Sequence, residues 1–281
     1  MAPTQKHRWL TRPDSRDQRR LRSLRQFSLD RARLLFEADY PGVRFGPVVA
    51  VIAAYNEEEN IGDVLKAMPT LVGDLEVSTL VVVDGSSDHT AQVARDCGVY
   101  VCEMPVNLGQ GAALRLGYQL ALSHGARFVV TLDADGQNDP AEMETMLALV
   151  LADEVDMVIA SRRLGVDQTT DWFRRAGVNF YAWCINTIVS QHLTDSSNGY
   201  RVFKAELLAD VEPHLIQEQY QTAEVVITTA SRGWRIGEQP TVWHPRASGI
   251  SKKGGNLIFG FSYAKVIATT WWRVTLGNHR R

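Results

Sequence analysis

The chain of 281 residues, 45% of them hydrophobic, is long enough to bury one large core or two small ones. Its formal net charge of -2 excludes the strongly basic balance of a nucleic-acid-binding domain, so no nucleic-acid partner is expected. The three cysteines are odd in number and lack the spacing of a zinc or redox motif, which indicates a reducing, cytoplasmic location.

The first 45 residues are set apart by their charge. Lysines and arginines crowd this segment and far outnumber its acidic residues. Such a run is a candidate for binding an anionic surface, and the alternative is a solvated helix face. The segment has no apolar run of the kind that a secretory signal needs, so we expect the chain to stay on the cytosolic side of the membrane.

Residues 48–161 alternate short runs rich in Val, Ile and Leu with longer helical stretches. This alternation predicts strand-helix-strand units that build a mainly parallel sheet, and hence an α/β fold. In open sheets of this kind ligands bind beyond the carboxyl ends of the strands, which is where Glu57, Asp84 and Asp133 lie. The expected strands are residues 48–53, 80–83, 99–103, 128–132 and 157–160, and the expected helices are residues 60–68, 90–97, 111–123 and 140–151.

The second half of the chain is less regular. An aromatic-rich stretch predicts a helix at residues 179–193, and a second helix at 222–232 ends before Gly233, as helices often do. Residues 234–243 then predict a strand, in which Pro240 favours a position at the edge of the sheet.

Two carboxylates, Asp133 and Asp135, stand one residue apart directly after the apolar run of residues 128–132. A hard cation such as Mg2+ or Mn2+ prefers oxygen ligands. In phosphate chemistry it is usually held by one or two carboxylates, while phosphate oxygens of the substrate complete its shell. The pair therefore predicts a metal site, and the alternative is a solvated turn at the end of a strand.

Further motifs flank this pair in a definite order. Tyr-Asn-Glu follows the first expected strand, Asp-Gly-Ser the second, and Asn-Leu-Gly-Gln-Gly precedes the helix expected from residue 111. Asp-Ser-Ser-Asn-Gly-Tyr-Arg stands at residues 195–201, and Arg-Ala-Ser-Gly-Ile-Ser-Lys at 246–252. In this order the motifs resemble inverting glycosyltransferase family 2, most closely its dolichol- or polyprenyl-phosphate hexose synthases.

The resemblance implies a GT-A type, Rossmann-like α/β fold with a mainly parallel sheet flanked by helices. It also implies a single catalytic domain at residues 46–253, with a basic N-terminal arm at 1–45 and an amphipathic tail at 254–281. Ala53 stands where the family often has Pro, and Gln110 where it often has Lys, so a cationic contact from that loop is in doubt.

The same resemblance implies roles on the donor side. Asp133 and Asp135 are expected to bind the metal and the diphosphate, and Gln137 to support the same metal cluster. For Asp84 the alternative is a cap of a helix or turn. The expected nucleotide-binding residues are Ala53, Tyr55, Glu57, Asp84, Gly109 and Asp133.

The side chains needed on the acceptor side depend on the chemistry of the group that attacks the sugar. A sugar hydroxyl needs a general base, whereas a phosphate monoester with a second pKa near ~6 is already largely dianionic at neutral pH. A phosphate acceptor therefore needs cations for positioning more than it needs a base. Arg201, Arg246 and Lys252 match the family's phosphate-binding positions and complete the expected catalytic set with Asp133 and Asp135.

Three further residues are weaker candidates. Arg162 is a possible fourth phosphate ligand, and Asp195 and Glu224 are possible base or orienting groups. For each arginine or lysine the alternative is an ordinary surface ion pair.

Residues 257–276 come nearest to a membrane span, but Lys265 and Arg273 interrupt them. Apolar and aromatic residues are interleaved with basic ones there, a pattern typical of a segment in the membrane interface. We therefore expect a peripheral protein at the cytoplasmic face of the membrane. The alternative is a helix packed on the domain, because Trp and Phe are also ordinary core residues.

The expected function is metal-dependent transfer of a hexose from a GDP- or UDP-hexose to a polyprenyl phosphate, with inversion. One alternative is a family 2 transferase that acts on a hydroxyl of a sugar, a protein or a small molecule. A second alternative is a scaffold protein without activity, which the intact Asp133, Asp135, Arg201 and Lys252 disfavour.

Overall fold

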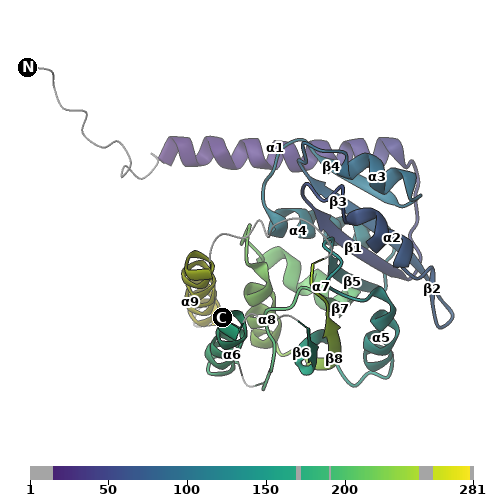
Figure 1. Cartoon of the computed structure of the whole chain (residues 1–281). Coiled ribbons are helices and arrows are strands. Elements are labelled where there is room, and N and C mark those ends of the chain that lie inside the picture. The colour runs from purple at the N-terminus through teal and green to yellow at the C-terminus, as the bar shows by residue number, and fades with distance from the viewer. Residues whose placement is uncertain (1–14, 169–171, 190, 247–255, 279–281) are drawn as a thin grey trace, which may run out of the picture.

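The computed structural model describes residues 15–168, 172–189, 191–246 and 256–278 (Figure 1). Their strands form one sheet in the order β2-β3-β1-β5-β7-β6-β8, with β4 paired to β3. The strands are β1 Val48–Ala54, β2 Leu71–Val72, β3 Leu75–Asp84, β4 Tyr100–Met104, β5 Phe128–Asp133, β6 Met157–Asp167, β7 Arg201–Lys204 and β8 Ile236–Trp243.

Helices cover both faces of this sheet (Figure 1). The α-helices are α1 Ser15–Asp39, α2 Ile61–Ala67, α3 Thr90–Asp96, α4 Gln110–Ser123, α5 Met143–Leu151, α6 Trp172–Asn186, α7 Ala205–Val211, α8 Gln221–Ser231 and α9 Asn256–Asn278. Short 3-10 helices are η1 Pro140–Glu142 and η2 Glu212–His214.

The core lies in two layers, one on each face of the sheet. Along β1, Val49 and Val51 point into the layer under α1, α4, α7, α8 and α9. Val48, Ala50 and Ile52 point into the opposite layer, under α2, α3 and α5. Because both faces of β1 are buried, its sequence is apolar throughout instead of alternating with polar residues.

The predicted α/β fold is confirmed, with β1, β3, β4 and β5 running parallel. The short strand β7 was not predicted, and it runs antiparallel to both β5 and β6. Strand β8 lies at the edge of the sheet, where the sequence placed Pro240. Together these strands bring the Arg201 motif beside the end of β5, a proximity that no local sequence pattern encodes.

The bounds predicted for the helix at 179–193 were wrong: α6 spans Trp172–Asn186, so it begins and ends seven residues earlier. The side chain of Asn186 ends the helical run by closing the following loop. Its Nδ2 donates to the Leu193 carbonyl at 2.8 Å, and its Oδ1 accepts from the Leu193 N–H at 2.9 Å. A local side-chain contact of this kind competes with helix continuation.

The basic N-terminal segment is helical from Ser15, and its core contacts come from its second half, while Arg25 in the first half pairs with Glu218. Ala32 and Phe36 of α1 are buried in the core, whereas the first half of the helix is exposed and extends past the body of the domain (Figure 1). That exposure fits both interpretations of the basic segment, so binding of an anionic surface stays a prediction.

The C-terminal helix α9 has two different faces. Tyr263, Val266 and Ile267 are buried in the core beside α8. Phe261 and Trp272 point outward and are 80% and 63% exposed. Among the described residues, we find no helix with the length and apolar character needed to cross a membrane. The domain boundaries at residues 45 and 253 stay a prediction.

Candidate active site

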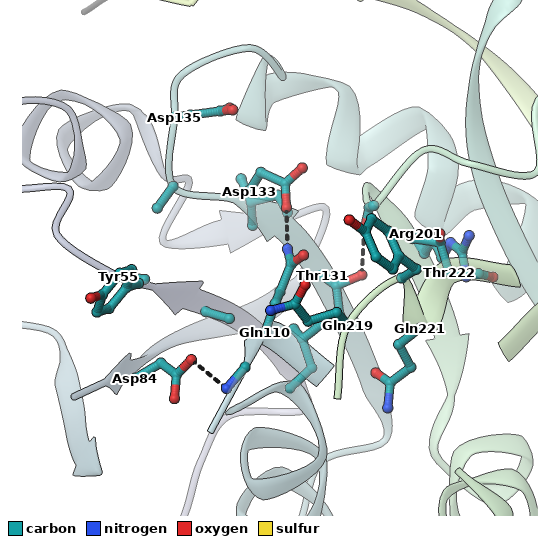
Figure 2. A pocket seen from close by; sticks show the side chains of 18 of the residues that line it. Tyr55, Asp84, Gln110, Thr131, Asp133, Asp135, Arg201, Gln219, Gln221 and Thr222 are labelled. Carbon is teal, nitrogen blue, oxygen red and sulfur yellow. Dashed lines mark hydrogen bonds between the residues drawn. The ribbon is translucent and has the colours of Figure 1, made fainter. Parts of the chain in front are cut away.

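A cleft of about 380 Å³ opens at the carboxyl ends of β1, β3 and β5 (Figure 2). This is the edge at which ligands bind in parallel sheets, because the strand-to-helix turns leave a crevice there. The residues singled out from the sequence that line it are Ala53, Tyr55, Glu57, Asp84, Gly109, Asp133, Asp135 and Arg201.

Asp84 ends β3 and organises the loop that follows β4. Its Oδ1 accepts from the Leu108 N–H at 2.7 Å and its Oδ2 from the Gly109 N–H at 2.9 Å. Burial raises the pKa of Asp84, although these two N–H groups act in the opposite direction. These two bonds fit the alternative role of Asp84, a cap of a helix or turn. Each carboxylate oxygen still has a second lone pair that could accept from a ligand in the cleft.

Gly109 and Gly111 let the start of α4 lie against residues 217–218. A Cβ atom at Gly109 would stand 2.5 Å from the Glu218 carbonyl oxygen, and one at Gly111 would clash with Gln217. The Gly111 N–H donates to the Glu218 carbonyl at 2.7 Å. The two glycines therefore allow the backbone of α4 to approach the backbone of residues 217–218 closely. Nucleotide binding by Gly109 stays a prediction.

Asp133 and Asp135 both border the cleft but have different neighbours. The Gln110 amide donates to Asp133 Oδ1 at 2.9 Å (Figure 2). The Gln137 N–H donates to Asp135 Oδ1 at 3.2 Å, and Arg246 Nη2 lies 3.4 Å from Asp135 Oδ2. Gln110 thus makes a neutral contact with Asp133 at the position where the family often has a lysine.

These two carboxylates fit a hard divalent cation that shares its shell with a phosphate. Their oxygens are the preferred ligand type. Among the residues that the structure describes, no group of three or more His, Cys, Asp and Glu side chains is arranged to hold a metal by itself. A cation at this position would therefore take further ligands from substrate and water, as Mg2+ commonly does.

Gln137 faces the end of β8. Its Nε2 donates to the His244 carbonyl at 3.1 Å, and its own carbonyl accepts from the His244 N–H at 3.0 Å. These bonds tie the Asp135 turn to the strand that leads to Arg246. A role for Gln137 in the metal cluster stays a prediction.

Arg246 joins two acidic residues that lie far from it in the sequence. Its Nη2 donates to Glu57 Oε1 at 2.8 Å and also lies close to Asp135. Glu57 Oε2 accepts from the Asn60 side chain at 2.8 Å. The structure therefore brings Arg246 to Glu57 and Asp135, whereas Lys252 lies outside the described residues.

Arg201 is a buried cation at the wall of the cleft, 2% exposed. It donates to the carbonyls of Asn198 at 2.8 Å, Thr222 at 3.0 Å and Ser196 at 2.9 Å. Burial lowers the pKa of Arg201, yet a guanidinium stays protonated in proteins. The three carbonyls are neutral and fix the guanidinium in place, while the negative charges of Asp195 and Asp133 help to stabilise its positive charge.

Arg162 and Asp195 are committed to each other. Arg162 Nε and Nη2 donate to the two oxygens of Asp195 at 2.6 and 2.8 Å, and Nη2 also donates to Ser197 at 2.7 Å. The guanidinium lies 4.7 Å from the centre of the Trp243 ring. This buried pair does not support Arg162 as a phosphate ligand or Asp195 as a base.

The contacts of Glu224 likewise do not support a role as a base. Its carboxylate accepts from the Ile216 N–H at 3.0 Å, the Gln217 N–H at 2.9 Å and Arg273 at 2.6 Å. The side chain is fully buried. Of the two roles open from the sequence, these contacts support the orienting one.

The sequence analysis missed one wall of the cleft. Residues 219–222, just before and at the start of α8, line it. Figure 2 shows Gln219, Gln221 and Thr222 beside Arg201. Tyr220 has φ 57°, a left-handed conformation that is uncommon for a residue with a side chain. No periodicity or motif marks this segment in the sequence, because its place depends on contacts with α4 and α9.

We expect Asp195→Asn to reduce the free energy of unfolding by about 3–5 kcal/mol at neutral pH, since it leaves Arg162 as an unpaired buried charge. Burial raises the pKa of Asp195, but the charge and hydrogen bonds of Arg162 outweigh this and hold it below its usual range. The pair therefore stabilises the fold above the unfolded pKa, and this stabilisation is lost as pH falls through the folded value. Urea unfolding at several pH values measures the difference.

The matched control is Asp63→Asn in the exposed pair with Lys66, which should change stability little. Equal unfolding free energies for wild type and Asp195→Asn at neutral pH would contradict the structural role of the pair.

Comparison with known proteins gives a consistent result. A model of glycosyl transferase family 2 matches residues 49–211. The undecaprenyl-phosphate mannosyltransferase of Micrococcus luteus is 30% identical over 233 residues, which cover 80% of this chain and 93% of that protein. The dolichyl-phosphate hexose transferase of Haloferax volcanii is 31% identical over 225 residues, which cover 79% and 94%.

A solved structure shares the fold. It is the glucosyl-3-phosphoglycerate synthase from Mycobacterium tuberculosis in complex with Mn2+, UDP and glucosyl-3-phosphoglycerate. The TM-score is 0.59 at 18% sequence identity, over 84% of this chain and 82% of that one. At this identity the likeness concerns the fold alone.

Proposed function

This chain belongs to glycosyl transferase family 2, and from that premise we propose that it moves a hexose from a GDP- or UDP-hexose to a polyprenyl phosphate. It is a glycosyltransferase with the GT-A type fold that the resemblance implied. The names of the two relatives support the lipid phosphate acceptor, and the complex with UDP and Mn2+ supports the donor class and the metal. Inversion and dependence on Mg2+ or Mn2+ are part of the proposal.

The observation that carries this proposal is the position of Arg201. Its buried guanidinium borders the same cleft as Asp133 and Asp135, and its hydrogen bonds go to three neutral backbone carbonyls. A site with carboxylates for a metal at one wall and a buried cation at another suits a reaction between two phosphate-bearing substrates.

On the donor side, we propose that Asp133 and Asp135 hold the cation and that Gln137 fixes their turn. When bound, the metal neutralises charge that develops on the leaving diphosphate. Glu57 and Asp84 would accept hydrogen bonds from the nucleoside. The backbone around Ala53, together with Tyr55 and Gly109, would form the rest of its pocket.

On the acceptor side, Arg201 would orient the phosphate, assisted by Arg246 and Lys252. The phosphate oxygen is the nucleophile and attacks the anomeric carbon opposite the departing diphosphate, so one glycosidic bond forms as the other breaks. No proton has to leave a dianionic phosphate, which agrees with the commitment of Asp195 and Glu224 to structural contacts.

A panel of nucleotide sugars with a short polyprenyl phosphate, analysed by mass, tests this function. The expected product is a polyprenyl-phosphate hexose formed only with a divalent cation. The competing family 2 activity, transfer to a hydroxyl, would instead appear with a free polyprenol or a sugar acceptor.

We also propose that the protein works at the cytoplasmic membrane face. Helices α6 and α9 lie side by side, with Tyr181 and Tyr263 in ring contact at 4.8 Å (Figure 1). Their outer faces expose an aromatic patch beside Lys265, which suits an interface where rings sit at headgroup depth and long cations reach water. The exposed patch residues are Phe180, Trp183, Phe261, Trp271, Trp272 and Leu276.

We expect wild type to pellet with anionic liposomes at low salt, and a Trp183→Ser, Trp272→Ser double variant to lose most of this binding. The reason is the loss of buried ring area at the interface. Point substitutions are preferable to truncation after Lys253, because the inner face of α9 belongs to the core. Leu151→Ser on α5, which is 50% exposed, is the control. Equal pelleting of wild type and double variant would refute docking through this patch.

A further inference from the structure

The missed wall of the cleft is held by contacts from several elements. We call residues 216–222 the cleft wall, because its second half, Gln219 to Thr222, lines the cleft. From α4, the Gly111 N–H donates to the Glu218 carbonyl, and Arg115 Nη1 donates to the Gln217 carbonyl at 2.7 Å. These bonds fix the carbonyls of Gln217 and Glu218. Because the wall lines the cleft, its position affects the shape of the cleft.

The other side of the cleft wall is held by Glu224 of α8. Its carboxylate accepts the N–H groups of both Ile216 and Gln217. A fully buried carboxylate needs positive partners: Arg273 of α9 lies at 2.6 Å, and the charge of Arg115 on α4 also interacts with Glu224. Helix α9 thus stabilises the Glu224 carboxylate, which accepts the two backbone N–H groups of the wall.

A second contact joins α9 to the cleft. Thr222, which lines the cleft, donates its hydroxyl to the Tyr263 hydroxyl at 3.3 Å. The carbonyl of the same threonine accepts from Arg201. The Tyr263 ring also meets the Tyr220 ring edge-on, with centroids 6.4 Å apart. Helix α9 therefore supports the cleft at both ends of the segment from 216 to 222.

We propose that Arg273 and Glu224 are positioning residues, through which α9 holds the cleft wall in the geometry that binds the nucleotide-diphosphate donor. This inference rests on the proposed function of the cleft as a donor site. Neither residue is among the residues that line the cleft, so their effect must pass through the backbone of residues 216–220. Loss of the Arg273 charge weakens the hold of Glu224 on two N–H groups and lets the wall move.

The test uses the full chain and measures binding of UDP and of GDP, each with Mn2+, by calorimetry. For the nucleotide that binds wild type, Arg273→Gln should raise Kd about tenfold, a typical effect of losing a hydrogen bond to a charged group. Arg273→Lys keeps the charge and should recover most of the affinity. Lys66→Gln removes an exposed cation of α2 and should leave Kd unchanged.

Amide hydrogen exchange separates positioning from general unfolding. In Arg273→Gln, exchange should accelerate at Ile216 and Gln217 while the amides of the central strand β5 stay protected. If this variant instead loses protection throughout, Gly111→Ala provides the second test. Its added Cβ would clash with the Gln217 carbonyl and displace the wall from the α4 side, with the same increase in Kd expected.

The outcomes distinguish the two levels of the proposal. Equal Kd values for wild type, Arg273→Gln and Gly111→Ala would overturn the positioning role and leave the proposed function intact. Failure of wild type to bind either nucleotide would overturn the donor site itself, and this inference with it.

Discussion

Replacing Asp135 by Asn is expected to lower glycosyl transfer at least ~100-fold, comparable to removing another main electrostatic stabiliser of a transition state. Asparagine keeps the shape of the side chain and an oxygen that can accept from the Gln137 N–H. It loses the negative charge that a divalent cation and a leaving diphosphate require. Initial rates at saturating donor, with and without added Mn2+, measure the effect.

Two controls accompany this experiment. Asp96→Asn changes an exposed aspartate of α3 and should leave the rate unchanged. Binding of Mn2+ in the presence of nucleotide should weaken in Asp135→Asn, which provides a measure independent of turnover. Near-normal turnover of the variant, or of wild type stripped with a chelator, would show that the metal assignment is wrong.

The second large effect is expected at Arg201. Arg201→Lys retains a positive charge but lacks the planar fork that bonds the carbonyls of Ser196, Asn198 and Thr222. We expect transfer to polyprenyl phosphate to fall by roughly 100-fold, because the cation is no longer held where the phosphate is oriented. The assay compares kcat and KM for a short polyprenyl phosphate.

A matched substitution separates this effect from simple loss of an arginine. Arg232→Lys alters a partly exposed ion pair with Asp210, so its kinetics should match wild type. The acceptor assignment fails if a free polyprenol serves as well as the phosphorylated lipid, or if Arg201→Lys transfers at the normal rate.

The sequence by itself determined the central architecture and half of the cleft. Apolar runs followed by polar turns predicted β1, β5 and the second half of β3, because strands buried on both faces are apolar throughout. The edge strand β4 was predicted as well, although its Glu103 is exposed. The positions of Asp84 and Asp133 followed from the same pattern, since the carboxyl ends of parallel strands meet at one edge of a sheet. These features depend on local periodicity, which a single sequence contains.

Only the tertiary structure decided which charged side chains are available to a ligand. Arg162, Asp195 and Glu224 looked like site residues in the sequence, but burial pairs each with a partner distant along the chain. Arg201 is also buried, yet its hydrogen bonds go to neutral backbone carbonyls and its side chain lines the cleft. A buried charge must find compensation, and whether a protein group or a ligand supplies it depends on distances that sequence spacing does not fix.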